Sequence, residues 1–171
     1  MKVADIALYC AKDIGRNCYC VFETEMTEAM SRRHELESDL RHAIENDELI
    51  LHYQPIVDAK TRKMCGAEAL IRWQHPTKGL IPPDQFIPLA EETGLISQIG
   101  GWVLYNACIE AASWPAGVKL AVNLSTKQFK RDNLVDVVMC ILVETGLPPE
   151  RLELEITETA LIESATTVLP L

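Results

Sequence analysis

The sequence has little of what a metal site built on sulfur or imidazole needs, although its 171 residues include six cysteines and four histidines. The cysteines form no CxxC pair, and the histidines form neither an HxxxH nor an HExxH spacing. A structural zinc site and a histidine-based metal site are therefore not expected. Scattered cysteines are typical of reduced thiols rather than of a disulfide framework, which indicates a cytoplasmic location.

Long apolar runs and an excess of basic residues are also missing. No run reaches the roughly 18 residues that a membrane helix needs, and the first residues carry no secretory signal pattern. The formal net charge of −9 disfavours binding to duplex nucleic acid, whose phosphates require a basic surface. An acidic protein can still bind a small anionic ligand where divalent cations neutralise the local charge. The length and the 48% of hydrophobic residues predict a soluble globular chain with a sizeable core.

The strand-like segment at 67–73 places an acid and a base in an otherwise apolar run. Alternate side chains of a strand share a face, so Glu68, Leu70 and Arg72 lie on one side and the other side is apolar. A carboxylate in the interior of a sheet is costly unless it is paired or binds a cation. A metal at Glu68 and an anionic group at Arg72 would account for both charges.

Two later segments repeat this combination of one apolar face and one face with oxygen ligands. The polar face of 119–125 carries Ala121, Asn123 and Ser125, and that of 151–158 carries Glu153, Glu155 and Thr157. Each segment alone is also compatible with a half-buried amphipathic strand that has a solvated face. The three together predict a single polar site at the strand ends.

The hydrophobic pattern predicts an alternation of helices and strands. We expect helices over 4–13, 31–46, 85–93, 97–114, 133–144 and 160–168, and strands over 18–22, 49–57, 67–73, 119–125 and 151–158. A Pro/Gly-rich loop is expected over 75–83. Asp84, Ser97 and Asn133 are the predicted N-caps, and Gly94 is a predicted helix stop.

The order of these elements predicts an α/β fold. The strands at 49–57 and 67–73 are joined by a short turn, so we expect them to be antiparallel. From there the alternation of strand and helix is typical of a parallel sheet. A doubly wound sheet would fit this alternation of strands and helices.

Four stretches carry a resemblance to the EAL domain family. They read LHYQPIVD, GAEALIRWQHPTKGLIPPDQFIPLAEETGLI, LAVNLS and LPPERLELEITET, and the similarity runs from about residue 35 to 163. The resemblance implies a partial (β/α)₈ TIM-type barrel that contains the first four strands. It also implies a role in bacterial second-messenger signalling. The family's activity is metal-dependent hydrolysis of cyclic di-GMP to pGpG, with Mg²⁺ or Mn²⁺ as cofactor.

Residues 4–22 resemble the end of a GGDEF (diguanylate cyclase) domain. The GGDEF signature itself is absent, so no cyclase activity is expected from this stretch. The resemblance divides the chain into a short α/β remnant and linker at 1–30 and the N-terminal half of an EAL domain at 31–171.

Carried over motif by motif, the resemblance assigns a metal site. Glu68 of the EAL motif, Asn123 of VNLS and Glu155 of EITE would be metal ligands, and Glu158 would steady a loop over the metal. Glu153 of the same strand is interpreted as a solvated or helix-facing acid without a catalytic role.

The resemblance also assigns a substrate site. Arg72 would bind a phosphate of cyclic di-GMP, and Gln54 and Leu70 would lie along the dinucleotide. The alternative for Arg72 is a simple ion pair with a neighbouring acid.

The family's later DDFGTG, KID and AEGVE segments do not occur in the sequence. The expectation is therefore a phosphodiesterase domain that is truncated and inactive as an isolated chain, whether or not a longer parent protein is active. The alternative is a non-catalytic module for cyclic di-GMP sensing or protein interaction. An open half-barrel exposes strand edges, so we also expect self-association through the strand at 151–158.

Overall fold

The structure is a computed structural model that describes residue 21, residues 24–129 and residues 134–156. The chain divides into two compact units, Met1–His42 and Ala43–Leu171. The described part of the first unit is dominated by helix α2, Thr24–Ala43. The elements expected at 4–13 and 18–22, and with them the GGDEF-like tail, lie almost entirely outside the described residues. The domain boundary at 30/31 stays a prediction.

Helix α2 begins at Thr24, well before the start expected from the sequence at residue 31. The added turns contain Glu25, Met26, Glu28 and Ala29 and neither glycine nor proline. These residue types favour helix. The acidic stretch 23–29 could be read from the sequence as a linker or as a helix start, and from Thr24 on it is the start of α2.

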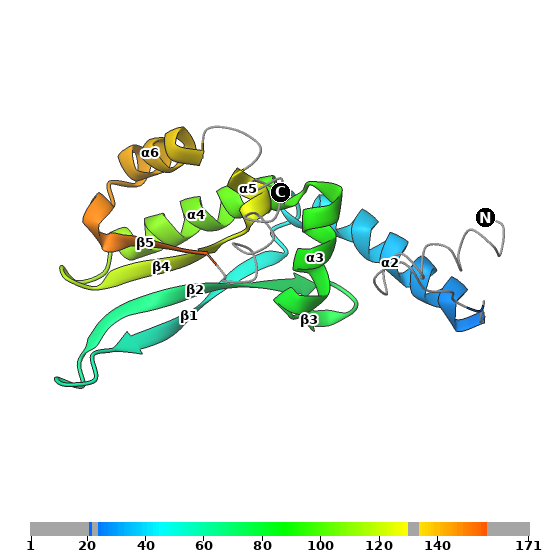
Figure 1. Cartoon of the computed structure of the whole chain (residues 1–171), viewed down its shortest axis with the longest axis horizontal. Helices are drawn as coiled ribbons and strands as arrows, with labels where there is room; N and C mark the ends of the chain where they lie inside the picture. The colour runs from blue at the N-terminus through cyan, green and yellow to red at the C-terminus, as the bar shows by residue number, and fades with distance from the viewer. Residues whose placement is uncertain (1–20, 22–23, 130–133, 157–171) are drawn as a thin grey trace, which may run out of the picture. The chain divides into compact units, whose positions relative to one another are not determined.

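The second unit is built on one mixed sheet with strand order β1-β2-β4-β5 (Figure 1). Strand β1 (Leu49–Val57) is antiparallel to β2 (Met64–His75). Strands β4 (Lys119–Leu124) and β5 (Leu152–Ile156) continue the sheet in parallel. The α/β class and the antiparallel first strand are thereby confirmed, and the arrangement is consistent with a partial barrel.

A short strand, β3 (Gly79–Ile81), pairs antiparallel with the end of β2, where only a loop was expected from the sequence. Gly79 has a φ of 74°, which glycine adopts without a steric penalty. The turn before it is held by Nδ1 of His75, which accepts the backbone N–H groups of Thr77 and Lys78, each at 3.2 Å. These side-chain contacts close a hairpin that the composition of the loop does not reveal.

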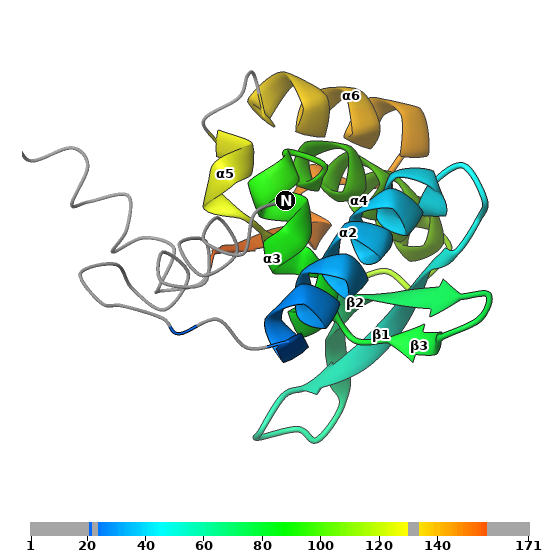
Figure 2. The same ribbon diagram turned by 90° about the vertical axis from the view of Figure 1, so that its right-hand side faces the viewer.

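Helices cover one face of the sheet (Figure 2). Helix α3 (Pro83–Thr93) and helix α4 (Ile96–Ala112) pack against β2, and α4 also packs on β4. Helix α6 (Leu134–Thr145) lies on α4, on the side away from the sheet. The four-residue helix α5 (Thr126–Phe129) follows β4, and a 3₁₀ turn, η1 (Pro149–Arg151), leads into β5.

The prediction that Asp84 caps α3 is wrong. The N-cap residue is Pro82, and Pro83 occupies the first helical position without a side-chain cap. A proline there loses no hydrogen bond, because the first N–H groups of a helix have no partner within it. Asp84 instead lies in the first turn, where its charge is favourable for the helix dipole.

The junction between α3 and α4 is partly as predicted. Gly94 ends α3 in the left-handed conformation, with a φ of 79°. Ser97 is not an N-cap, because α4 already begins at Ile96 and the residue before it, Leu95, has helical backbone angles. The predicted cap Asn133 lies outside the described residues.

The core between the sheet and its helices is centred on Trp73, which is fully buried and meets Phe86 edge-on with ring centroids 5.7 Å apart. The indole Nε1 donates a hydrogen bond to Oε2 of Glu48 at 2.9 Å, so the buried polar atom is satisfied. Strand β4 contributes Leu120 and Val122 to the same core. This confirms the predicted apolar faces of β2 and β4.

Tyr53 of β1 lies on the helix-covered face and meets Trp114 edge-on, with ring centroids 5.3 Å apart. Burial, with the negative charge of Glu110 as a second cause, raises the pKa of Tyr53 to about 12. The phenol therefore stays neutral well above the pH at which an exposed tyrosine ionises.

The thiols of Cys65, Cys108 and Cys140 are free. Burial raises the pKa of the Cys108 thiol to about 11, which is typical of an inert core cysteine. Throughout the described stretches, no helix combines the length and the hydropathy required to cross a bilayer. The cytoplasmic location stays a prediction.

Candidate functional site

The sheet has one polar face, opposite α3 and α4. Gln54 pairs across β1 and β2 with Glu68, and Asn123 pairs across β4 and β5 with Glu155. Glu68 also pairs with Ala121, two residues before Asn123. Cross-strand partners point to the same side of a sheet. The face that results brings together six predicted site residues, which are Gln54, Glu68, Leu70, Arg72, Asn123 and Glu155.

Contact between two of the predicted ligands is direct. Nδ2 of Asn123 donates a hydrogen bond to Oε1 of Glu68 at 2.6 Å, across the β4–β2 boundary. Glu155 is the cross-strand neighbour of Asn123 on the other side. The predicted site residue Glu158 lies outside the described residues.

Three adjacent strands therefore present two carboxylates and one side-chain amide to the same side. Such oxygen donors suit Mg²⁺ and Mn²⁺. Within the described ranges, no group of three or more His, Cys, Asp and Glu side chains could hold a metal by itself.

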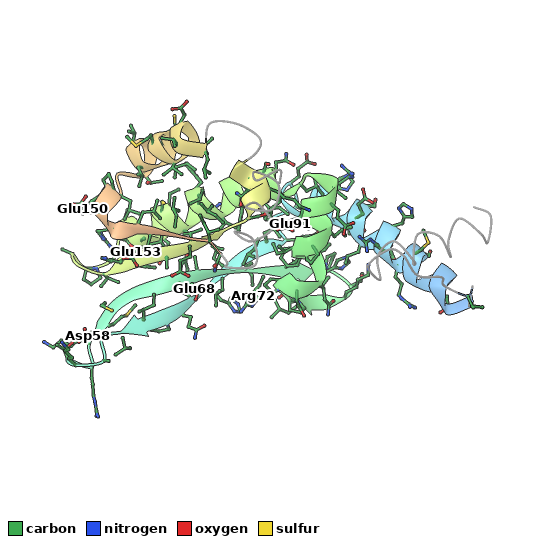
Figure 3. The ribbon with its side chains drawn as sticks, in the orientation of Figure 1. Asp58, Glu68, Arg72, Glu91, Glu150 and Glu153 are labelled. Carbon is green, nitrogen blue, oxygen red and sulfur yellow. The ribbon has the colours of Figure 1, made fainter. Side chains whose placement is uncertain are left out.

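Arg72 lies farther along the same face of β2 than Glu68 (Figure 3). Its side chain is half-buried, and Nη1 donates to the backbone oxygen of Ile71 at 2.8 Å. In the part of the chain that the structure describes, no acidic side chain forms an ion pair with Arg72.

Glu153 lies on the polar face and forms an ion pair with Lys119 across β4 and β5. Both side chains are about half exposed, at 47% and 51%. The hydrogen bond and the charge of Glu153 raise the pKa of the Lys119 ammonium. Of the two sequence-based interpretations of Glu153, the helix-facing one is wrong and the solvated one is confirmed.

Ser125, expected as the last residue of the polar strand face, lies just after the end of β4 and belongs instead to a polar cluster that the sequence did not predict. Oγ of Ser125 donates to Oε1 of Glu91 at 2.7 Å, and the backbone N–H of Ser125 donates to Oε1 of Gln128 at 2.8 Å. The spacing Ser-x-x-Gln is that of a capping box, which would have predicted helix α5. No signal in the sequence pointed to Glu91, because its partner lies on another element.

A cavity of about 330 Å³ lies among β2, β4, α3 and α4. Ser125, Gln128, Glu91 and Asn123 contribute to its wall, and most of the remaining lining is apolar. The polar cluster and the candidate ligand Asn123 thus border the same space.

The fold and this face define an α/β protein whose sheet carries two carboxylates, a side-chain amide and an arginine on one polar side. The family model described as EAL domain matches residues 37–170. The chain therefore belongs to the EAL domain family, which confirms the resemblance.

Two curated relatives support this assignment. An uncharacterized signaling protein of Caulobacter vibrioides is 51% identical over 163 residues, which are 95% of this chain and 20% of that protein. The bifunctional diguanylate cyclase/cyclic di-GMP phosphodiesterase MucR of Pseudomonas aeruginosa is 49% identical over 166 residues, 95% of this chain and 24% of that protein.

Among solved structures, the phosphodiesterase PaMucR in complex with c-di-GMP matches with a TM-score of 0.73 and 49% identity. The match covers 78% of this chain and 56% of the solved one. Of the two curated relatives described above, this chain spans only about a fifth to a quarter of the length. A GGDEF-like tail before residue 31 stays a prediction.

Proposed function

We propose that this chain is part of a phosphodiesterase domain that hydrolyses cyclic di-GMP to pGpG with Mg²⁺ or Mn²⁺. The observation that carries the proposal is the 2.6 Å contact between Asn123 and Glu68, with Glu155 as the next cross-strand neighbour. The 49% identity to a bifunctional cyclase/phosphodiesterase supports the choice of substrate.

The metal would be held by Glu68, Asn123 and Glu155. Two carboxylates and an amide oxygen fit the preference of Mg²⁺ and Mn²⁺ for hard oxygen ligands, and waters or further ligands would complete the octahedral shell. Such an ion, when bound, activates a water molecule and stabilises charge on the phosphodiester oxygens. Glu158 is assigned, by resemblance, to the loop over this site.

The substrate would lie along the polar face. The planar guanidinium of Arg72 can form two parallel hydrogen bonds to a phosphate. Gln54 lies directly across from Glu68, and Leu70 lies between Glu68 and Arg72, so both would line the dinucleotide. Because the formal net charge is −9, an anionic ligand depends on these local cationic groups.

The family segments DDFGTG, KID and AEGVE, which would supply further metal ligands and a lysine beside the reacting water, do not occur in these 171 residues. We therefore propose that the isolated chain is inactive or nearly so. The three ligands of the described sheet would serve one part of a larger metal site.

The deciding experiment is an assay of pGpG formation in Mn²⁺, together with equilibrium dialysis of cyclic di-GMP. Glu68→Ala is the test variant, and Glu153→Ala is its matched control, because Glu153 is on the same face but is paired with Lys119. Metal-dependent binding of cyclic di-GMP that is lost in Glu68→Ala and retained in Glu153→Ala supports the proposed site. Turnover with the same dependence would also support the site, but it would contradict the proposed inactivity of the isolated chain.

Two other outcomes point elsewhere. Metal-independent binding of cyclic di-GMP without turnover, equal in both variants, would favour the non-catalytic sensing module. If a folded sample showed neither binding nor turnover, the polar face would not be a cyclic di-GMP site in this chain.

A further inference from the structure

The chain changes from strand to helix immediately after the candidate ligand Asn123. Strand β4 ends at Leu124 and helix α5 begins at Thr126, so Ser125 alone makes the transition. Oγ of Ser125 accepts the backbone N–H of Lys127 at 3.2 Å, and Oε1 of Gln128 accepts the N–H of Ser125 at 2.8 Å. A helix of four residues is too short to be stable by itself, so these contacts need support from neighbouring elements.

The first support comes from a glycine in α4. Gln128 is only 8% exposed, and its side-chain amide lies directly against Gly100. A Cβ at Gly100 would lie 1.8 Å from Nε2 of Gln128, which is far inside van der Waals contact. Gly101, the next residue of the same helix, would place a Cβ in open space, with nothing within 4 Å. Glycine weakens a helix interior. At position 100 it is nevertheless needed, because any side chain there would collide with Gln128 in its present position.

The second support comes from α3. Oγ of Ser125 donates to Oε1 of Glu91 at 2.7 Å, and Nζ of Lys127 lies 3.8 Å from Oε2 of the same carboxylate. The hydroxyl of Ser125 is thus used both as a donor and as an acceptor. Glu91 and Gly100 together anchor the end of β4 to the two helices that cover the sheet.

We propose that Glu91, Gly100 and Gln128 are positioning residues for Asn123. The inference rests on the proposed function, because it concerns the geometry of a proposed metal ligand. Nδ2 of Asn123 donates to Glu68, which leaves Oδ1 as the atom that would face a cation. The turn at Ser125, two residues later, fixes the position of the Asn123 backbone. In that position Nδ2 of Asn123 can donate to Glu68 while Oδ1 stays available to a cation.

The test compares Gly100→Ala with Gly101→Ala, two adjacent and chemically identical changes. In Gly100→Ala the new methyl group displaces the end of the Gln128 side chain, for which the neighbouring cavity of about 330 Å³ offers room, so the fold is retained. The Ser125 N–H then loses its acceptor. We expect the NMR signals of the Asn123 side-chain amide to shift in Gly100→Ala and to stay in place in Gly101→Ala.

Binding of Mn²⁺ is the second readout, followed through paramagnetic broadening of the same signals. Residues that orient metal ligands typically alter metal affinity roughly tenfold to a hundredfold. We expect the dissociation constant for Mn²⁺ to rise by that factor in Gly100→Ala and to be unchanged in Gly101→Ala.

A second pair of variants tests the anchor on α3. Glu91→Gln keeps an oxygen that can accept from Ser125, whereas Glu91→Leu does not. Glu91→Gln should therefore keep the wild-type Asn123 signals and Mn²⁺ affinity within about twofold, since it loses only the half-exposed ion pair with Lys127, whose atoms are 3.8 Å apart. Glu91→Leu should shift the Asn123 signals and weaken Mn²⁺ binding. Its melting curve must show that the variant is folded.

The outcomes separate the two proposals. Asn123 signals that remain unchanged in both Gly100→Ala and Glu91→Leu would overturn the positioning role, even if the wild type binds Mn²⁺ at Asn123. Shifted signals in a protein that shows no Mn²⁺ broadening at Asn123 would uphold the positioning role and contradict the proposed metal site.

Discussion

Arg151 caps the carboxyl end of helix α4, with Nη2 donating to the carbonyl oxygen of Ala111 at 2.8 Å. Its Nε donates to the carbonyl oxygen of Val118 at 2.9 Å, immediately before β4. The last carbonyl groups of a helix have no partner within it, and a cation at this end is favourable for the helix dipole. One guanidinium thus joins the turn before β5 to α4 and β4.

Replacing Arg151 should therefore destabilise the second unit. Arg151→Met removes two charge-assisted hydrogen bonds, and we expect a loss of about 2–4 kcal/mol in the free energy of unfolding. Urea denaturation measures this loss, with Arg62→Met as a control, because Arg62 lies exposed in the β1–β2 turn. Equal stability of the two variants would contradict the capping role.

Tyr53 should make stability fall at high pH. Its folded-state pKa is about 12, whereas an unfolded tyrosine ionises near 10. Above the unfolded pKa the unfolded chain loses the proton and the folded chain keeps it, so stability decreases as the pH rises between these two values. Chemical denaturation at a series of alkaline pH values should show a smaller decline in Tyr53→Phe than in the wild type. Identical slopes for the two proteins would argue against a half-buried phenol that stays neutral.

Arg72 should matter through its geometry and not only through its charge. Arg72→Lys keeps the charge but loses the planar fork that can bind a phosphate through two parallel bonds. We expect roughly tenfold weaker binding of cyclic di-GMP, since one charge-assisted hydrogen bond contributes about 1.5 kcal/mol. Calorimetric titration measures the effect, and Arg62→Lys provides the exposed control. Unchanged affinity in Arg72→Lys would remove Arg72 from the substrate site.

Strand β5 should mediate self-association. It is the last strand in the order of the described sheet, and its apolar residues Leu154 and Ile156 are 37% and 36% exposed. Unpaired strand edges with apolar side chains favour pairing with another chain. We expect Leu154→Lys to lower the average mass measured by light scattering. Leu80→Lys, at a 50% exposed position of β3, is the control and should change it little. A wild-type protein that stays monomeric would contradict this prediction.

The polar face of the sheet was predictable because it depends on local geometry. The period of two in a strand is enough to place Glu68 with Arg72 on one side and Asn123 or Glu155 on the polar side of their own strands. The register between strands is not local, since long helical segments separate β2 from β4 and β4 from β5. The resemblance suggested that Asn123 and Glu68 lie close together, but the strand pattern by itself could not predict their 2.6 Å contact.

The errors arose where several local signals compete or where contacts come from distant parts of the chain. Asp84 is a good capping residue, but the preceding Pro83 fits the first helical position and shifts the boundary. The close approach of Gln128 to Gly100 depends on two elements whose packing no spacing rule reveals. In the sequence, only the presence of Gly100 within a predicted helix hinted at a close approach by another element.

The reversed direction of β1 determines where the chain comes into the sheet. Leu49 lies across from Trp73 and Ile50 across from Arg72. The preceding residue, Glu48, accepts the backbone N–H of Gln74 at 2.7 Å. A parallel first strand would have brought the chain in at the opposite rim, beside Gly66. A pulling force applied to the chain just before β1 would therefore act first on the strand pairing next to Arg72.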